Sequence, residues 1–379
     1  MMVLLQAKPC EAQDDVCQAT LAQYVFEDAR SFKRQGHPEQ PYYQLGGVST
    51  PVNAVPGVVP NIDGAGMIAY APLSTVTSSA MVSVGYFRQS KALLEEDTTF
   101  RRTFQDWIPR ASVWLLHNRA ATVGIPTPEN NHPFQVKLSD RPGDTWSFMG
   151  NGGSPLSMAS YRRHITDPRI LKANPLAQQL RSSTHKPQMP QQDALVAEMT
   201  DTERLFHLIL QKALPTLDGK PLSQESLPAF KASVLRTYQH TMSQYPIKVL
   251  APFSQGKGYQ EAKGPEGFLT PDSRYPRQVP NSVVLSNGEY TFLLLHEYPL
   301  FYQLRHSVKH PQEVETVIVA SEPTNLATFY AQGQTFPSHV TRWQWIPDHT
   351  LVTLHREATG RITMHWEPIV LKVPSRLSH

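Results

Sequence analysis

The stretch LLHNRAATVG, residues 115 to 124, decides how the rest of the chain is interpreted. An apolar run ends in a histidine, an arginine and a threonine, and a glycine follows. A strand leading to Arg119 and Thr122 can present a guanidinium fork and a hydroxyl at one edge of a sheet. Such a fork holds a carboxylate through two parallel hydrogen bonds. The same pattern is also typical of an ordinary strand end with a surface arginine, so the neighbouring segments have to decide.

The composition favours a large, loop-rich fold. Of the 379 residues, 40% are hydrophobic, which is enough for a sizeable core. Only 18% are charged, below the usual level of about 25%, and 33 are prolines, which favours loops and strand edges over long surface helices. The net charge is +3 and no run of five basic residues occurs, so a nucleic-acid partner is not expected.

The cysteine content and the apolar runs bear on localisation. Cys10 and Cys17 are neither in a CxxC motif nor near histidines at zinc spacing, so the sequence predicts two free thiols in a reducing compartment. The start MMVLLQAKP has no basic region typical of a signal peptide. No stretch approaches the ~20 apolar residues that span a bilayer. We therefore expect a soluble cytoplasmic protein with no membrane partner.

Short strands and amphipathic helices mix along the chain. Apolar runs bounded by turn residues predict strands at 2–7, 65–72, 111–119, 146–151, 316–323, 349–357 and 364–373, and a hairpin at 281–297 around Ser-Asn-Gly. Helical spacing predicts helices at 14–32, 90–108, 200–214 and 224–244. The third helix opens with a capping box, Thr200 to Glu203. The segments 181–193 and 254–267 are predicted to be mobile loops. This mixture favours two packed sheets with helices outside.

An ordered series of motifs surrounds the opening stretch. DGAGMIAYAP (63–72) precedes it, and ENNHPF (129–134), WSFMGNGG (146–153) and TDTE (200–203) follow. The series resembles the glutaminase domain of class II glutamine amidotransferases, a branch of the N-terminal-nucleophile hydrolases. That family has a Cys directly after the initiator Met, then H-x-R-x-A-T-x-G, an N-x-H-P-F-like segment, H-N-G and [ST]-D-[ST]-E. Downstream, LSNGEYTFLLLHEYPLFY, VIVASEP and WQWIPDHTLVTL resemble the C-terminal part of stand-alone members, so the resemblance covers nearly the whole chain.

The resemblance implies a fold and a small-molecule partner. The implied class is α+β, a four-layer αββα sandwich of the N-terminal-nucleophile hydrolase type. Residues 1–379 would form one domain whose C-terminal strands extend the same sheets. The implied partner is a glutamine-like or γ-glutamyl small molecule, while a protein partner or self-association stays open. No cofactor is expected, because the sequence has no P-loop, no GxGxxG and no histidine pair at metal-ligand spacing.

The family roles carry over by position. Arg119 and Thr122 would hold the α-carboxylate of the ligand, and Asp201 its α-ammonium. Asn151, through its side-chain amide, and Gly152, through its backbone N–H, would form an oxyanion hole. Asp201 also stands in the first turn of a helix, where a carboxylate is favourable anyway.

The two histidines of the motifs are harder to assign. From the resemblance, we expect His132 to be one of the residues that bind the substrate. His132 and His117 are nevertheless each predicted to be hydrogen-bonded structural histidines rather than an acid or a base.

The chain departs from the family at three positions. MMVLLQAKP aligns with the family start M-C-x-L-L, so Met2 stands at the nucleophile position, and a thioether has no proton to lose. Gly150 replaces the histidine of H-N-G, and Ala65 replaces the tryptophan of D-G-W-G.

Other residues could in principle supply a nucleophile. Cys10 is an alternative if a short leader is removed, although the segment after it does not resemble the expected strand. Ser154 has no evident base beside it, and Cys17 falls within a helical pattern and is expected in the core.

Three functions follow from these residues. The first is a binding or regulatory protein that keeps an amino-acid site without ordinary glutaminase activity. The second is an active amidohydrolase or amidotransferase acting on a glutamine-like or γ-glutamyl amide with an unusual nucleophile. The third is a structural or interaction protein with a vestigial site.

Overall fold

The structure is a computed structural model of the whole chain. It describes residues 1–11, 13–27, 41–43, 50–51, 64–73, 80–90, 98–119, 128–152, 154, 156, 161, 163–173, 200–243, 281–296, 300–321 and 339–370. Both predicted mobile loops, 181–193 and 254–267, lie outside the described residues, as does Thr122.

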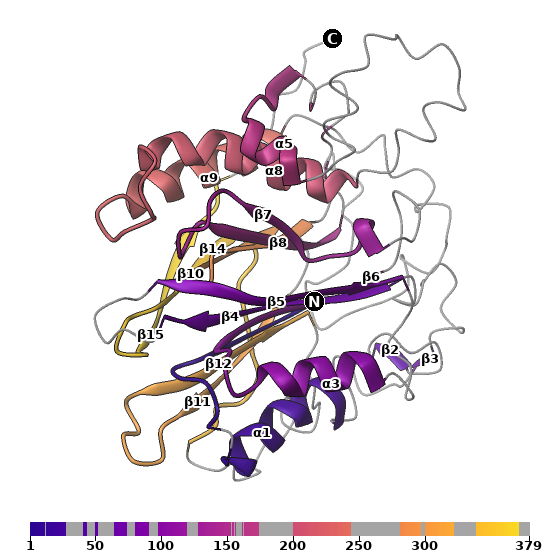
Figure 1. Cartoon of the computed structure of the whole chain (residues 1–379), viewed down its shortest axis with the longest axis vertical. Coiled ribbons are helices and arrows are strands. Elements are labelled where there is room, and N and C mark those ends of the chain that lie inside the picture. The colour runs from indigo at the N-terminus through magenta and orange to yellow at the C-terminus, as the bar shows by residue number, and fades with distance from the viewer. Residues whose placement is uncertain are drawn as a thin grey trace.

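Two antiparallel sheets pack face to face, with helices on both outer surfaces (Figure 1). The seven-stranded sheet has the order β13 (Gln344–Trp345), β11 (Phe301–His306), β12 (Val314–Ala320), β1 (Met2–Gln6), β6 (Val113–Arg119), β4 (Gly64–Pro72) and β5 (Met81–Gln89). The six-stranded sheet has the order β15 (Ile362–Pro368), β14 (Thr350–Arg356), β10 (Tyr290–His296), β9 (Asn281–Ser286), β8 (Thr145–Gly152) and β7 (Phe134–Lys137). A small pair, β2 (Pro41–Tyr43) and β3 (Thr50–Pro51), lies apart.

The helices divide between the two outer faces. Above the six-stranded sheet lie α5 (Pro168–Ala173), α8 (Asp201–Ala213) and α9 (Leu227–Ser243), and below the seven-stranded sheet lie α1 (Asp15–Ala22) and α3 (Thr98–Trp107) (Figure 1). Shorter helical turns are η1 (Gln23–Glu27), η3 (Pro128–Asn130) and η4 (Leu214–Leu217). None of the described helices is long and apolar enough to cross a membrane.

Three buried apolar clusters correspond to the three spaces between these layers. One joins the upper helices to the six-stranded sheet, with Phe148 stacked on Phe206 at 5.2 Å between ring centroids. One joins α1 and α3 to the seven-stranded sheet around Trp114. The third fills the space between the sheets with residues such as Val3 and Leu293. The predicted α+β class and four-layer αββα arrangement are therefore confirmed.

Local signals placed β1, β4, β6, β8, β14, α8 and the hairpin strands within two residues. The helix predicted at 90–108 begins only at Thr98 in the described residues, β15 ends at Pro368 rather than at 373, and β5, β7, β11, β13 and α5 were not predicted. The Thr200 hydroxyl accepts a hydrogen bond from the backbone N–H of Glu203 at 3.1 Å and begins α8, as the capping pattern predicts. The predicted hairpin is β9 and β10. In its turn only Gly288 has a positive φ, 88°, and the Asn287 side chain instead accepts from the N–H of Tyr290 at 2.8 Å. The turn is therefore not of the type in which both the asparagine and the glycine have a positive φ.

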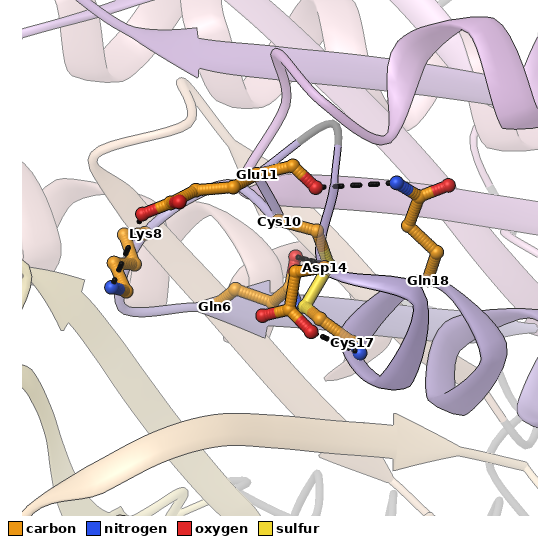
Figure 2. Close-up of a disulfide and its surroundings, with 7 residues drawn as sticks. All are labelled: Gln6, Lys8, Cys10, Glu11, Asp14, Cys17 and Gln18. Carbon is orange, nitrogen blue, oxygen red and sulfur yellow. Dashed lines mark hydrogen bonds and ion pairs between the residues drawn. A yellow bond between two sulfur atoms is a disulfide. The ribbon is translucent and has the colours of Figure 1, made fainter.

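The prediction of two free thiols is wrong. Cys10 and Cys17 form a disulfide, with their Cα atoms 5.6 Å apart, and it links the segment after β1 to α1 (Figure 2). The Asp14 side chain begins α1 by accepting from the N–H of Cys17 at 2.9 Å. The Gln6 amide lies 3.4 Å from the sulfur of Cys10 and 3.3 Å from that of Cys17. The two cysteines therefore give no reason to expect a reducing compartment.

Candidate functional site

The strands that carry the two principal motifs end on the same side of the sandwich. Arg119 is the last residue of β6 in one sheet, and Gly152 is the last of β8 in the other. Successive side chains of a strand point to opposite faces. Since Leu115 belongs to the cluster between the sheets, His117 and Arg119 face the same layer. We call this side of the molecule the site end.

Two histidines are in contact in that layer. His132 lies just before β7, and its Nδ1 is 3.2 Å from Nε2 of His117, with the ring centroids 4.3 Å apart. Both rings also touch the backbone of Gly150 in β8. Its carbonyl oxygen lies 3.0 Å from Nε2 of His117, and its N–H donates to Nδ1 of His132 at 3.4 Å. The histidines therefore connect β6 and β7 to the end of β8.

Burial keeps both rings neutral. It lowers the pKa of His132 to about 3, helped by the nearby positive charge of Arg119. It also lowers the pKa of His117 well below the ordinary value, and His132 and the Met1 amino group act in the same direction. The hydrogen bonds of His117 with Gly150 and the Asn151 side chain oppose this shift without reversing it.

Asn131 fixes Arg119 in the layer. The guanidinium donates to the Asn131 side-chain oxygen at 3.4 Å, and the Asn131 amide donates to the carbonyl of Gln89 in β5. A Cβ at Gly66 would lie 2.2 Å from the His132 carbonyl oxygen. Only a glycine therefore allows β4 to approach the histidine segment this closely. We call His117, Arg119, Asn131 and His132 the histidine–arginine cluster.

The predicted oxyanion segment ends β8. Asn151 pairs with Ser282 of β9 and is half-buried, and its side chain acts on His117. Gly152 is exposed and has a φ of 87°, a conformation that favours glycine. A Cβ at Gly150 would lie 2.9 Å from a Val283 methyl and 3.3 Å from that of Thr202. The close approach of β9, and next of α8, therefore favours a residue without a side chain at this position.

The start of β1 reaches the site end through Met1 rather than Met2. Met2 is fully buried with Leu116 and Trp114 on the face toward α1 and α3. Met1 belongs to the cluster between the sheets, and its amino group donates to the Ser321 hydroxyl at 3.2 Å. The residue predicted at the nucleophile position thus points away from the histidine layer.

Asp201 lies over the outer surface of the six-stranded sheet, in the first turn of α8. Its carboxylate accepts from the backbone N–H of Ser154 at 2.5 Å. Burial raises the pKa of this carboxyl group, while the Ser154 hydrogen bond and the charge of Arg204 oppose the shift. Arg204 itself donates to the Leu156 carbonyl at 2.9 Å. The structure thus places Asp201 and Arg119 on opposite faces of the six-stranded sheet, near the same end.

The other candidates contribute little to this site. Cys10 is 2% exposed and bonded to Cys17, so it has no thiol available as a nucleophile. Ala65 is fully buried in the cluster beneath the seven-stranded sheet. In the part of the chain that the structure describes, no three His, Cys, Asp or Glu side chains are grouped so that they could hold a metal ion.

Three residues that shape the site have no role predicted from the sequence. Asn131 stands inside the quoted motif ENNHPF, but only its contact with Arg119 reveals its role. Arg88 donates to the Glu129 carbonyl at 2.7 Å and holds the turn before His132, and alternation in β5 gave no hint of this. Ser321 meets Met1 through long-range strand pairing that no local pattern reports.

Comparison with known proteins gives structural likenesses alone. No protein-family model matches the chain, and neither does any curated protein. Glutamine phosphoribosylpyrophosphate amidotransferase from B. subtilis is similar over 98% of this chain and 49% of its own, at 12% identity and a TM-score of 0.44. This chain therefore spans about half the length of that enzyme.

Two shorter proteins are also similar. A glutamine aminotransferase class-II domain protein from Silicibacter pomeroyi matches at 15% identity and a TM-score of 0.37, covering 81% of this chain and 92% of that one. A predicted glutamine amidotransferase from Pseudomonas aeruginosa matches at 13% and 0.38, covering 79% and 86%. These likenesses are distant, so the description of the site depends on the contacts within this chain.

Proposed function

We propose that this chain is a class II glutamine amidotransferase-like protein that binds a glutamine-like or γ-glutamyl amino acid and lacks ordinary glutaminase activity. The observation that carries the proposal is the meeting of two motifs at the site end. HNRAATVG brings His117 and Arg119 there on β6, and FMGNGG brings Gly150 and Asn151 there on β8. The guanidinium of Arg119 can bind the α-carboxylate of an amino acid, and the side-chain amide of Asn151 can donate a hydrogen bond to the ligand's own side-chain amide.

Asp201 is the proposed partner of the ammonium group. Because Asp201 and Arg119 lie on opposite faces of the six-stranded sheet, a headgroup held by both would have to lie beyond the site end of that sheet. Burial raises the pKa of Asp201, so its ionised form is poorly stabilised by the protein alone. A ligand ammonium beside it would favour the charged carboxylate.

The lack of an activated nucleophile among the described residues supports a binding role. The 379 residues contain two cysteines, and both are in the disulfide. Met1 and Met2 carry thioethers, which have no proton to lose. The Ser154 hydroxyl accepts from the N–H of Leu156 at 3.4 Å, whereas Asp201 contacts the Ser154 backbone and not its hydroxyl. Among the described residues, therefore, no activated nucleophile stands beside the motifs.

Calorimetric titration tests the binding half. We expect L-glutamine or a γ-glutamyl amide to bind the wild type, and Arg119→Lys to weaken binding by roughly 10-fold or more, because lysine cannot form the bidentate fork. Arg110→Lys, at an exposed position after α3, is the matched control and should bind like the wild type. Absence of binding by every amino acid tried would refute the proposal.

An assay of glutamate release tests the second half. We expect no turnover of L-glutamine at the usual enzymatic rates of about 1 s⁻¹ or more. Turnover at such rates would overturn the binding role and favour an active amidohydrolase. Intact-mass measurement of the same sample establishes which residue carries the free amine.

A further inference from the structure

Several buried side-chain atoms have no hydrogen-bond partner among the described residues, and one of them is on a ring of the histidine–arginine cluster. Nδ1 of His117 makes no hydrogen bond with the described residues, although the side chain is only 4% exposed. Asn151 acts on the same ring but does not satisfy this atom. Buried polar atoms in native proteins are paired in the great majority of cases, so an exception requires a reason.

The backbone of Gly150 determines which ring nitrogens carry hydrogen. A backbone N–H can only donate, so Nδ1 of His132, 3.4 Å from the Gly150 nitrogen, is an acceptor. A carbonyl oxygen can only accept, so Nε2 of His117, 3.0 Å from the Gly150 oxygen, carries the hydrogen. A neutral imidazole has one N–H. Nδ1 of His117 is therefore a bare lone pair.

This lone pair has little tendency to take a proton from water. Burial and the neighbouring His132 lower the pKa of His117 well below its ordinary value, so the ring is neutral at physiological pH. It remains able to accept a hydrogen bond from an uncharged donor.

Arg119 faces the same layer from two residues further along β6. Alternate residues on one face of a strand are about 7 Å apart. A small molecule can therefore meet the guanidinium with a carboxylate and the lone pair with a group at its other end. Asn151 approaches the same ring from β8.

We infer that His117 is a specificity-determining residue, whose Nδ1 accepts a hydrogen bond from an N–H of the ligand and so selects a carboxamide over a carboxylate. The inference rests on the proposed function and names the residue that separates glutamine from glutamate. The –NH2 of a carboxamide can donate to the lone pair. An ionised carboxylate has only acceptors and would place its own lone pairs against that of Nδ1.

If His117 has only a structural role, the glutamine preference should depend on its contact with Gly150 and not on Nδ1. Two conservative variants distinguish this structural role from a role in specificity. The side-chain amide of asparagine reaches the position of Nδ1, whereas that of glutamine reaches the position of Nε2. His117→Asn therefore keeps an acceptor for the ligand, and His117→Gln keeps a donor for Gly150. If His117 only fixes β8, His117→Gln should behave like the wild type.

The experiment is calorimetric titration of L-glutamine and L-glutamate into the wild type, His117→Leu, His117→Asn and His117→Gln, with His355→Gln as a buried-histidine control. Circular dichroism checks that each variant is folded. We expect the wild type to prefer glutamine by roughly 10-fold or more, because a mispaired buried acceptor is costly. The preference should disappear in His117→Leu and His117→Gln, survive in part in His117→Asn and remain in His355→Gln.

Two results would overturn the inference, and they differ in what else they overturn. Equal binding of glutamine and glutamate by the wild type, or an unchanged preference in His117→Leu, refutes the role of His117 and leaves the proposed binding function standing. If the folded wild type binds neither amino acid, the proposed function fails and the inference fails with it.

Discussion

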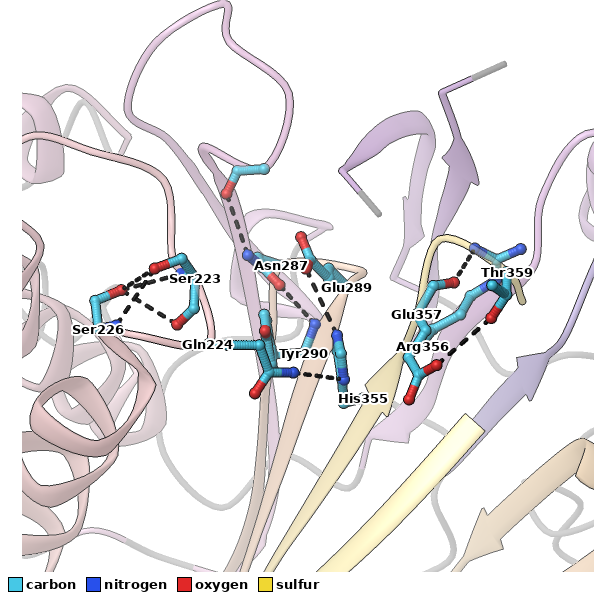
Figure 3. Close-up of polar contacts among 11 residues, drawn as sticks. Ser223, Gln224, Ser226, Asn287, Glu289, Tyr290, His355, Arg356, Glu357 and Thr359 are labelled. Atoms are coloured by element: carbon cyan, nitrogen blue, oxygen red, sulfur yellow. Dashed lines mark hydrogen bonds and ion pairs between the residues drawn. The ribbon is translucent and has the colours of Figure 1, made fainter. Parts of the chain in front are cut away.

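Each end of the sandwich buries histidine side chains, and His355 at one end differs from His117 at the other in how completely its ring is paired. At the end that holds the turn Asn287–Gly288, here called the hairpin end, both ring nitrogens of His355 have partners (Figure 3). The Gln224 amide donates to Nδ1 at 3.1 Å, and Nε2 lies 3.6 Å from a Glu289 oxygen. The ring also stacks on Tyr290 at 4.4 Å between centroids. At the site end, Nδ1 of His117 has no such partner among the residues that the structure describes.

The difference separates a histidine that stabilises the fold from one that is available to a ligand. Each partner of His355 comes from a different element, so the ring ties the loop before α9 to β10 and β14. His117 uses Nε2 in the same way, to hold β8, but leaves its second nitrogen open. Removing the paired ring should cost stability, whereas removing the open one should cost recognition.

The largest expected effect is at the hairpin end. His355→Leu should lower the free energy of unfolding by about 3 kcal/mol, because it leaves the buried Glu289 carboxylate without this partner and removes the acceptor of the Gln224 amide. Urea denaturation followed by circular dichroism measures the change. Gln224→Ala, which removes one hydrogen bond and leaves the contact of Nε2 with Glu289, should cost about 1 kcal/mol. A loss below about 1 kcal/mol in His355→Leu would show that the pairing is energetically unimportant.

The second effect concerns the segment that follows β1 at the hairpin end, which two different interactions link to the rest of the fold. Arg356 donates to the carbonyls of Gln6, at 3.1 Å, and Ala7, while the Cys10–Cys17 disulfide holds the next segment to α1. Reduction should lower the free energy of unfolding by about 2.5 kcal/mol, since a short closed loop restricts the unfolded chain.

Unfolding with and without dithiothreitol measures the effect of reduction. The double variant Cys10→Ala/Cys17→Ala should be insensitive to the reductant. Equal stability of the wild type with and without it would show that the link does not stabilise this end.

The sequence was informative where a local pattern determines the structure. The capping of α8 by Thr200 and the strand ends at Arg119 and Gly152 follow from residues a few positions apart. The disulfide could not be predicted in this way. A spacing of seven residues does not bring Cys10 and Cys17 within bonding distance until the chain folds back from β1 to α1.

The motifs grouped residues that the structure brings near one another, but they did not predict the contacts between them. Arg119, His132 and Asn151 lie at one end of the sandwich, whereas the pairing of His117 with His132 depends on how two sheets pack. The face to which the Met2 side chain points depends on the register of β1 in its sheet. A shift of one residue would move every side chain of the strand to the opposite face. Alignment to a motif fixes a position along the strand but not the face.

The third prediction uses acid to stress the site end. His132 has a folded-state pKa of about 3, against about 6.5 when unfolded. Its contribution to stability is therefore present in full above about pH 6.5 and is lost as the pH falls toward 3. At pH 5 the loss due to this residue should be about 2 kcal/mol.

A matched variant isolates this residue from the other buried histidines. His132→Asn does not titrate, and its amide oxygen can still accept from the N–H of Gly150. Between pH 7 and pH 5, its unfolding free energy should fall by about 2 kcal/mol less than that of the wild type. Parallel pH profiles for the two proteins would show that His132 can bind a proton without cost in the folded state.

The smallest expected effect on stability is at His117 itself. His117→Leu removes the hydrogen bond to the Gly150 carbonyl, which costs about 1 kcal/mol, and it also removes a buried polar atom without a partner, which offsets that loss. The free energy of unfolding should therefore stay within about 1 kcal/mol of the wild type, although the residue is as buried as His355. A loss of about 3 kcal/mol, equal to that of His355→Leu, would mean that Nδ1 is paired after all and that the two ends do not differ. A near-neutral variant that has lost its glutamine preference would instead show that the open nitrogen serves a ligand at the expense of stability.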